Sequence, residues 1–369
     1  MKYKLALLVL LTVYLSEVCF GQKNIFLKEE IKIKSDLENP DLENNGRSFS
    51  SAWDVCVDSE GNILILDFIS KKIFKYSPGG KLIFSVGKSG KGPDEFLFPM
   101  YMNVDKDNNI YVYDSSNRKF IIFAPDGRFI KSIKFKFNVR NFAIDNKGDF
   151  YIHYFEHNYR KKTCVAKLEI FSNKLVKKKK LYSSKINSHD YSKNNGVIEI
   201  REKYFGEKLC WGIMGDRIFV GESYKNWIKI LDKEGNLIDQ IKLDLNTTNT
   251  TAKDIRNFYS DDFQLDGQYY DDILLNDALQ DSYTSKEKPK YKNIFFVNNK
   301  LLIKTYNYSG NKFLFKEIDL KTKKGKDFYI DNSCLFKRNI ITKNYIYEDS
   351  KGHFNDEPYV KRFKVIGGF

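Results

Sequence analysis

A repeat with a period of 47 residues constrains the fold of this chain more than any other feature. Residues 58–67 (DSEGNILILD) recur 47 residues later as residues 105–114 (DKDNNIYVYD). The turn at residues 78–80 (PGG) recurs with the same separation at residues 125–127 (PDG). Two hairpin patterns that share one spacing indicate a repeat built of short antiparallel strands.

Further copies of this unit follow along the chain. They open near Asp145, Asp216, Asn298 and Lys343, and a complete copy contains four strand-like segments separated by polar turns. With 24 Tyr and 30 Phe, the composition also favours sheet over helix. A four-stranded sheet cannot bury both of its faces alone, and radial stacking of such sheets protects them. We therefore predict an all-β fold, a six-bladed β-propeller of four-stranded antiparallel blades.

The two ends of the chain are predicted to meet in the last blade. Only residues 358–365 remain there to form a third strand, which leaves the blade one strand short. The alternating segment 25–34, ahead of the first unit, is free to supply the outermost strand. Residues 22–369 then form a single propeller domain with insertions near 183–204 and 246–290.

Several segments resemble the NHL-type repeats of six-bladed β-propellers, of the type found in exported bacterial proteins. The most specific are residues 57–63, residues 114–118 with the strand that follows, and residues 87–96. The resemblance extends over roughly residues 48–365. It implies that residues 87–96 connect two blades. It also implies that the loops between second and third strands share a face with such connections, and that this face binds partners.

The N-terminus has the features of a secretory signal peptide. Lys2 and Lys4 precede an apolar run over residues 5–15, and small residues lead up to Gln22. This pattern predicts that residues 1–21 are cleaved and that the protein is secreted or periplasmic. A lipid anchor on Cys19 is a less favoured alternative. Later apolar runs are too short to cross a bilayer, so we expect no transmembrane segment.

The chain carries a formal net charge of +14. In the cytosol such a charge would suggest nucleic acid as a partner. An exported protein rarely meets nucleic acid, so we predict no nucleic-acid binding and expect the charge to favour anionic envelope polymers or solubility. The densest lysine run, residues 177–180, fits an outer strand whose charged side chains protect an exposed edge. We expect a monomer.

Three motifs imitate ligand sites. Glycines in residues 87–92 resemble a phosphate loop, but Pro93 and a strand follow instead of a helix. His153 and His157 have the His-x-x-Glu-His spacing of a zinc protease, which requires a helix, whereas residues 151–155 are predicted to be a strand and His157 a polar loop residue. Residues 105–109 resemble a calcium loop but lack the glycine at its sixth position. We predict that all three are structural.

No cofactor and no metal site are predicted. The cysteines outside the signal peptide are Cys56, Cys164, Cys210 and Cys334, and they show neither CxxC nor zinc spacing. Their disulfide state stays open. Aspartates and tyrosines in residues 259–277 could line a cleft that holds a cation, although a solvated excursion is the favoured interpretation.

The candidate ligand-binding residues are aromatic, charged and amide side chains placed at the junctions of second and third strands. They are Asp67, Asp114, Asn117, Arg118, Tyr154, His157, Arg160, Glu222, Tyr224, Trp227, Tyr306 and His353. Arg and aromatic residues dominate recognition surfaces because they offer large contact area and forked hydrogen bonds. We therefore predict a non-catalytic binding scaffold for a protein, peptide or glycan. The alternative is a calcium-dependent lactonase- or lyase-like enzyme with its site at the central channel.

Overall fold

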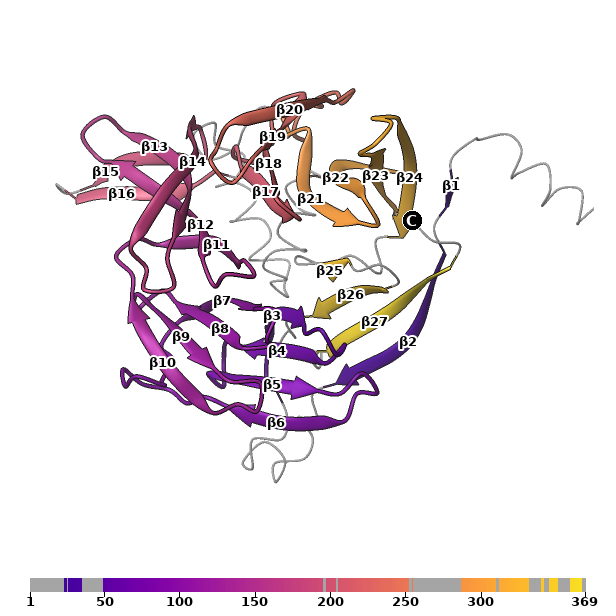
Figure 1. Ribbon diagram of the computed structural model, residues 1–369. Helices are drawn as coiled ribbons and strands as arrows, with labels where there is room; N and C mark the ends of the chain where they lie inside the picture. Colours follow the sequence, from indigo (N-terminus) through magenta and orange to yellow (C-terminus); the bar gives the residue numbers. More distant parts are fainter. Residues whose placement is uncertain are drawn as a thin grey trace, which may run out of the picture.

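The described residues form a ring of β-sheets. The structure, a computed structural model, describes residues 23–24, 26–34, 49–194, 197–203, 205–251, 254, 287–309, 312–331, 340–341, 345–350 and 359–366. Figure 1 shows the sheets arranged around a common centre. The predicted all-β class is confirmed.

Six four-stranded antiparallel units make up the ring, and each is one blade. In each blade the first strand lies near the centre and the last at the rim (Figure 1). Blade 1 consists of β3 (Ala52–Val57), β4 (Ile63–Asp67), β5 (Lys72–Tyr76) and β6 (Leu82–Val86), and blade 2 of β7 (Pro99–Val104), β8 (Ile110–Asp114), β9 (Lys119–Phe123) and β10 (Phe129–Lys134). Blade 3 consists of β11 (Val139–Ile144), β12 (Phe150–Asn158), β13 (Thr163–Phe171) and β14 (Lys177–Ile186), and blade 4 of β17 (Leu209–Met214), β18 (Arg217–Glu222), β19 (Trp227–Leu231) and β20 (Leu237–Lys242). Blade 5 consists of β21 (Tyr291–Val297), β22 (Lys300–Ser309), β23 (Lys312–Asp319) and β24 (Gly325–Asp331), and blade 6 of β25 (Ile340–Ile341), β26 (Tyr345–Ser350), β27 (Tyr359–Ile366) and β2 (Phe26–Lys34).

The N-terminal strand closes the ring, as predicted. β2 is the outermost strand of blade 6 and pairs antiparallel with β27, from Phe26 opposite Ile366 to Lys34 opposite Tyr359. The ion pair of Glu29 with Lys361, 2.9 Å, lies across this strand pair. The sequence did not indicate the short strand β1 (Lys23–Asn24), which adds to blade 5 parallel to β24. The N-terminal segment therefore joins two blades.

The repeated aspartates shape the hairpin turns. Oδ1 of Asp58 accepts hydrogen bonds from the backbone amides of Glu60 and Asn62, and Oδ1 of Asp105 accepts from those of Asp107 and Asn109. An aspartate that satisfies amides two and four residues ahead fixes a tight turn. The calcium-like segment is thus a hairpin turn, in agreement with the prediction.

The glycine-rich segment between blades 1 and 2 is also structural. A Cβ atom at Gly90 or Gly92 would overlap the carboxylate of Glu95, and that carboxylate accepts a hydrogen bond of 2.7 Å from the Gly92 amide. The segment leads from β6 to β7, which confirms it as a connection between blades.

Apolar side chains fill the spaces between neighbouring blades. The cluster between blades 2 and 3 is rich in aromatic rings, with Phe120 lying 5.0 Å from both Phe142 and Phe150 between ring centroids. Similar clusters lie between blades 6 and 1, 1 and 2, 3 and 4, and 4 and 5. Burial of these rings is a major driving force for stacking the blades.

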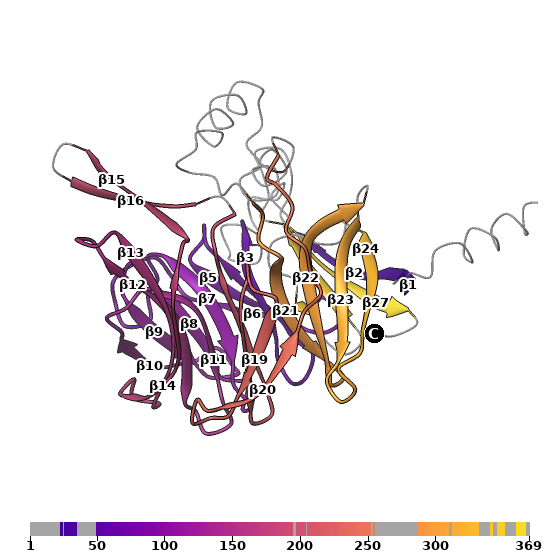
Figure 2. The same cartoon turned by 90° about the horizontal axis from the view of Figure 1, so that it is seen from above.

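The first insertion is a hairpin that leaves blade 3. β14 continues to Ile186, so the insertion starts later than predicted, with β15 (His189–Asn194) and β16 (Val197–Glu202). Figure 2 shows this hairpin projecting away from the blades. Of the second insertion, only residues 246–251, 254 and 287–290 are described.

Some expectations fall outside the described residues. These are the signal peptide at residues 1–21, the acidic segment 259–277, Cys334 and His353. Cys56, Cys164 and Cys210 are not in disulfides. Among the residues that the structure describes, no helix is long and apolar enough to cross a membrane.

The predicted boundaries of the second strands need correction. Tyr154, His157 and Tyr306 were expected in loops, which is wrong, because β12 extends to Asn158 and β22 to Ser309. β12 and β13 pair over nine residues without interruption. Polar side chains at alternate positions of a strand resemble a loop in the sequence, although the backbone pairing continues through them.

Candidate functional site

Two of the predicted residues stabilise the blade to which each belongs. The carboxylate of Asp67, at the end of β4, accepts a 2.5 Å hydrogen bond from the Ser50 amide. Asp114, at the end of β8, accepts one of 2.5 Å from the Leu97 amide and one of 2.9 Å from the Asn117 amide. Both aspartates are fully buried. Each therefore ties the entry of its blade to the junction of second and third strands, as a brace.

A second group of predicted residues lies at the top of blade 4. Glu222 is buried and accepts a 2.6 Å hydrogen bond from Tyr182. The Tyr224 hydroxyl lies 2.7 Å from the carbonyl oxygen of Phe205 and 2.6 Å from that of Glu287, so it can donate to either. Both side chains therefore connect segments of the chain to one another.

The aromatic residues of this region are also packed. Trp227 is half-buried at the start of β19, with the Lys229 ammonium 4.7 Å from its ring centroid. Tyr306 is buried in β22 and packs edge-on against Phe205. Arg160 is exposed in the turn between β12 and β13.

The structure brings three predicted residues together in one cavity. Asn117, Arg118 and Tyr154 line a hollow of about 820 Å³ between blades 2 and 3, which we call the blade 2–3 cavity. Its other lining residues are Ser116, Lys134, Phe135, Lys136, Phe137, Glu156, Lys167, Glu169, Phe171, Leu175 and Lys177. The cavity thus combines the β8–β9 loop, the connection from blade 2 to blade 3, and the outer strands of blade 3.

The charges around this cavity are unbalanced. Five basic and two acidic side chains line it. Glu156 pairs with Lys167 at 2.6 Å, and Glu169 pairs with Lys177 at 2.6 Å. Three further cations therefore lie around the cavity, on Arg118, Lys134 and Lys136.

These three cations come from the end of β10, the connection that follows it and the β8–β9 loop. The Lys134 ammonium donates a 3.1 Å hydrogen bond to the Asn117 carbonyl oxygen. The Lys136 ammonium lies 4.7 Å from the ring centroid of Phe137. The Arg118 carbonyl oxygen accepts a 2.8 Å hydrogen bond from the Phe135 amide, which joins the loop to the connection. Hydrogen bonds therefore fix the backbone that carries these positive side chains.

Aromatic rings form a wall of the cavity. Phe137 and Tyr154 stack with centroids 4.3 Å apart and an interplanar angle of 15°. Phe135 packs edge-on against Phe171, with centroids 5.1 Å apart. The Tyr154 hydroxyl donates a 2.8 Å hydrogen bond to Glu169, and burial together with this carboxylate raises the pKa of Tyr154. Tyr154 is therefore a neutral donor at physiological pH.

The sequence analysis did not identify the basic and aromatic residues of the connection, Lys134 to Phe137. The alternation of Lys and Phe in KFKF was a visible signal. It reads as the end of an outer strand, whereas β10 ends at Lys134 and the following residues turn into the cavity.

The predicted zinc-protease spacing does not form a shared site. His153 and His157 lie in β12, with the Phe155 ring between them. His153 is buried, and burial together with Arg140 lowers its pKa to about 3. Residues four apart on a strand, such as His153 and His157, point to the same face but lie roughly 13 Å apart along the strand. The interpretation as a strand is confirmed.

Comparisons with known proteins agree with this architecture. A family model described as a 6-bladed beta-propeller, DUF5128, matches residues 50–206. The fold is a six-bladed β-propeller. A comparison with curated proteins gives no match.

Solved structures show the same fold at low identity. A Bacteroides fragilis protein predicted to be exported has 10% identity and a TM-score of 0.56, over 95% of this chain and 97% of that chain. A DUF4221 member from Bacteroides vulgatus has 9% identity and a TM-score of 0.50, over 94% and 99%. Virginiamycin B lyase from Staphylococcus aureus has 11% identity and a TM-score of 0.44, over 93% of this chain and 100% of that chain. These likenesses show the fold alone, and the NHL-type naming stays a prediction.

Proposed function

We propose that this chain is an exported, non-catalytic binding protein that holds an acidic segment of a glycan or peptide in the blade 2–3 cavity. One observation carries the proposal. Arg118, Lys134 and Lys136 surround a cavity whose two carboxylates already have lysine partners.

The cavity has the make-up of a ligand site. Its volume of about 820 Å³ lies within the usual range of roughly 300–1,000 Å³ for such sites, which combine apolar walls with a few polar groups. Guanidinium and ammonium groups donate strong hydrogen bonds to carboxylate and sulfate groups. The stacked rings of Phe137 and Tyr154 offer a flat apolar surface for the uncharged part of a ligand.

The rest of the chain supports an anionic partner. The net charge of +14 attracts acidic polymers over the whole surface and raises their association rate. The signal-like segment at residues 1–21 supports export, and a propeller of similar fold is predicted to be exported. An exported protein meets acidic polymers of the cell envelope before it meets nucleic acid.

The test is calorimetric titration of the mature full-length chain with defined oligomers. The probes are an oligogalacturonate, a heparin-derived oligosaccharide, a glutamate-rich peptide and neutral maltohexaose. We expect one of the acidic probes to bind, with an affinity that falls as salt rises, and the neutral sugar not to bind. The acidic oligomer that binds most tightly identifies the ligand class.

Matched charge variants locate the binding. Arg118→Gln with Lys136→Gln removes two cations from the cavity, and Lys180→Gln with Lys185→Gln removes two from exposed positions of β14. We expect the first pair to weaken binding by about 10-fold or more, as loss of charged hydrogen bonds does, and the second pair to change it little. Equal losses in both variants would show non-specific attraction and refute the cavity. Chemical turnover of a lactone or of a bound oligomer would replace the proposal with the enzyme alternative.

A further inference from the structure

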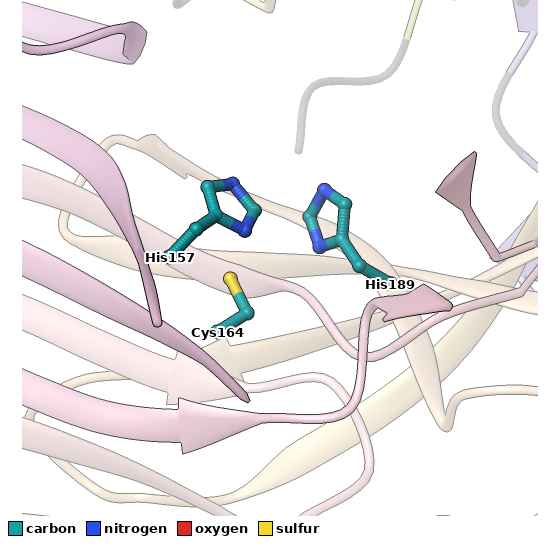
Figure 3. A group of neighbouring side chains, drawn as sticks. All are labelled: His157, Cys164 and His189. Carbon is teal, nitrogen blue, oxygen red and sulfur yellow. The ribbon is translucent and has the colours of Figure 1, made fainter. Parts of the chain in front are cut away.

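Two histidines and a cysteine from separate strands converge at the top of blade 3. His157 in β12 and Cys164 in β13 lie directly opposite each other in the strand pair. His189 is the first residue of β15, the hairpin that leaves the blade. One donor atom from each of the three lies within 4.8 Å of the other two. Figure 3 shows the two imidazole rings and the thiol gathered around a common point.

The surroundings shield these donors from solvent. Cys164 is 2% and His189 is 8% exposed, and His157 is partly buried. The His157 and His189 rings meet edge to face, with centroids 4.8 Å apart. Three polar donor groups thus share a largely enclosed place at the base of the hairpin.

Neighbouring side chains orient both imidazoles. His157 Nδ1 lies 2.9 Å from the Tyr191 hydroxyl, and His189 Nδ1 lies 2.6 Å from the Ser188 hydroxyl. Metal-binding histidines generally engage their second ring nitrogen in this way, which fixes the ring and its tautomer. Both rings are therefore held in place through Nδ1, and a metal ion would bind at Nε2.

Arg140 supports the same tautomer of His189. Its Nη2 atom lies 3.3 Å from His189 Nε2. A guanidinium can only donate, so Nε2 carries the lone pair and Nδ1 carries the proton. Metal binding at His189 Nε2 requires the Arg140 side chain to turn away.

We propose that His157, Cys164 and His189 form a binding site for a thiophilic d10 metal ion, Zn²⁺ or Cu⁺. Two imidazole nitrogens and one thiolate are donors that both ions accept. In a tetrahedral zinc site the donor atoms lie about 3.4–3.6 Å apart, so the present cluster needs to contract by about 1.4 Å or less. The thiol loses its proton on binding, and the resulting thiolate offsets one positive charge of the ion.

The site has a structural consequence for the hairpin. His157 and Cys164 belong to blade 3, whereas His189 belongs to β15. A bound ion would therefore link the projecting hairpin to the blade and fix the angle at which it leaves. This role is independent of ligand binding in the blade 2–3 cavity, which lies on the opposite side of blade 3, facing blade 2.

Metal titration of the mature full-length chain tests the site. Metal-free, reduced protein is titrated with Zn²⁺ and, under anaerobic conditions, with Cu⁺, each against a chromogenic chelator. We expect one equivalent of at least one ion to bind and to raise the melting temperature, since an ion that binds only the folded state stabilises it. Binding by Zn²⁺ alone or Cu⁺ alone supports the site and names its ion. Absence of a stoichiometric equivalent of either ion would refute it.

Spectroscopy and variants show whether these three residues bind the ion. Co²⁺ in place of Zn²⁺ should give a thiolate-to-cobalt charge-transfer band, which Cys164→Ala abolishes. The matched variant Cys210→Ala removes a buried thiol from blade 4 and should keep the band. His189→Gln should weaken binding by about 100-fold or more, and the positioning variants Ser188→Ala and Tyr191→Phe by about 10-fold. A cobalt spectrum without the thiolate band, or a band that survives in Cys164→Ala, would contradict the proposal.

Discussion

The rings of Phe137 and Tyr154 stack face to face with centroids 4.3 Å apart. Phe137 belongs to the connection between blades 2 and 3, and Tyr154 to the second strand of blade 3. The Tyr154 hydroxyl also donates to the buried carboxylate of Glu169. A single side chain thus joins the aromatic wall of the cavity to its charged part, so its two halves can be tested separately.

Tyr154→Phe should keep the stack and lose only the hydrogen bond to Glu169. We expect a loss of about 1.5–3 kcal/mol in the free energy of unfolding, the usual net value of a hydrogen bond to a charged group. Tyr154→Ala also removes the buried ring and should cost about 3–5 kcal/mol. Denaturant unfolding measures both. Equal losses in the two variants would show that the ring contributes nothing beyond its hydroxyl.

Asp67→Ala should destabilise blade 1 strongly. The change leaves the amides of Ser50 and Ile69 without the carboxylate that now accepts their hydrogen bonds at 2.5 and 2.8 Å. Asp67 is fully buried, and the loss of a hydrogen bond to a charged group costs about 1.5–3 kcal/mol. The control Asp126→Ala changes an exposed aspartate in a turn of blade 2 and should change the unfolding free energy by less than about 0.5 kcal/mol. Similar effects at the two positions would contradict a bracing role.

Deletion of residues 23–34 should lower the melting temperature sharply. The deletion removes β2 and leaves β27 as an unpaired edge, and it uncovers the apolar cluster that contains Ile33. Glu29→Gln with Glu30→Gln removes only the ion pairs to Lys361 and Arg362. Because partly exposed pairs contribute little, this variant should melt close to the wild type. An unchanged melting temperature after the deletion would show that β2 is dispensable for closure.

Glu207 should make stability depend on pH. Burial, together with the neighbouring Glu222 carboxylate, raises the pKa of Glu207. Folded protein then binds a proton that unfolded protein releases, so the unfolding free energy falls as pH rises from the ordinary glutamate pKa through the raised value. Glu207→Gln keeps an acceptor for the Asn187 amide and should remove this contribution. Denaturant unfolding between about pH 4 and pH 8 checks the difference, and parallel profiles for the two proteins would contradict it.

The architecture was predictable because its signals are local. A turn aspartate such as Asp58 or Asp105 bonds to amides within four residues, so the sequence shows the turn directly. The alternation of apolar residues in each strand is equally local. The strand that closes blade 6 could also be predicted, since the count of strands left one place empty and the alternating segment 25–34 was free to fill it.

Strand length and the sites were harder to predict. Glu156 and His157 are polar residues near the end of β12, and only the pairing with β13 shows that the strand continues through them. Arg118 and Tyr154 were selected separately as recognition residues, and nothing in their separation along the chain placed them in one cavity. Lys136 and Phe137 were missed because they looked like more of the preceding strand.

The amino-acid sequence by itself determined the repeat, the turns, the six blades and the strand that closes them, because each depends on contacts between residues close in the chain or on a fixed period. The tertiary structure alone decided which side chains meet. Cys164 faces His157 through the register of one hairpin, and His189 reaches them only because β14 ends at Ile186. A shift of one residue in register would turn such side chains to the opposite face of the sheet. Separation along the chain becomes a distance in space only when register, twist and packing are known.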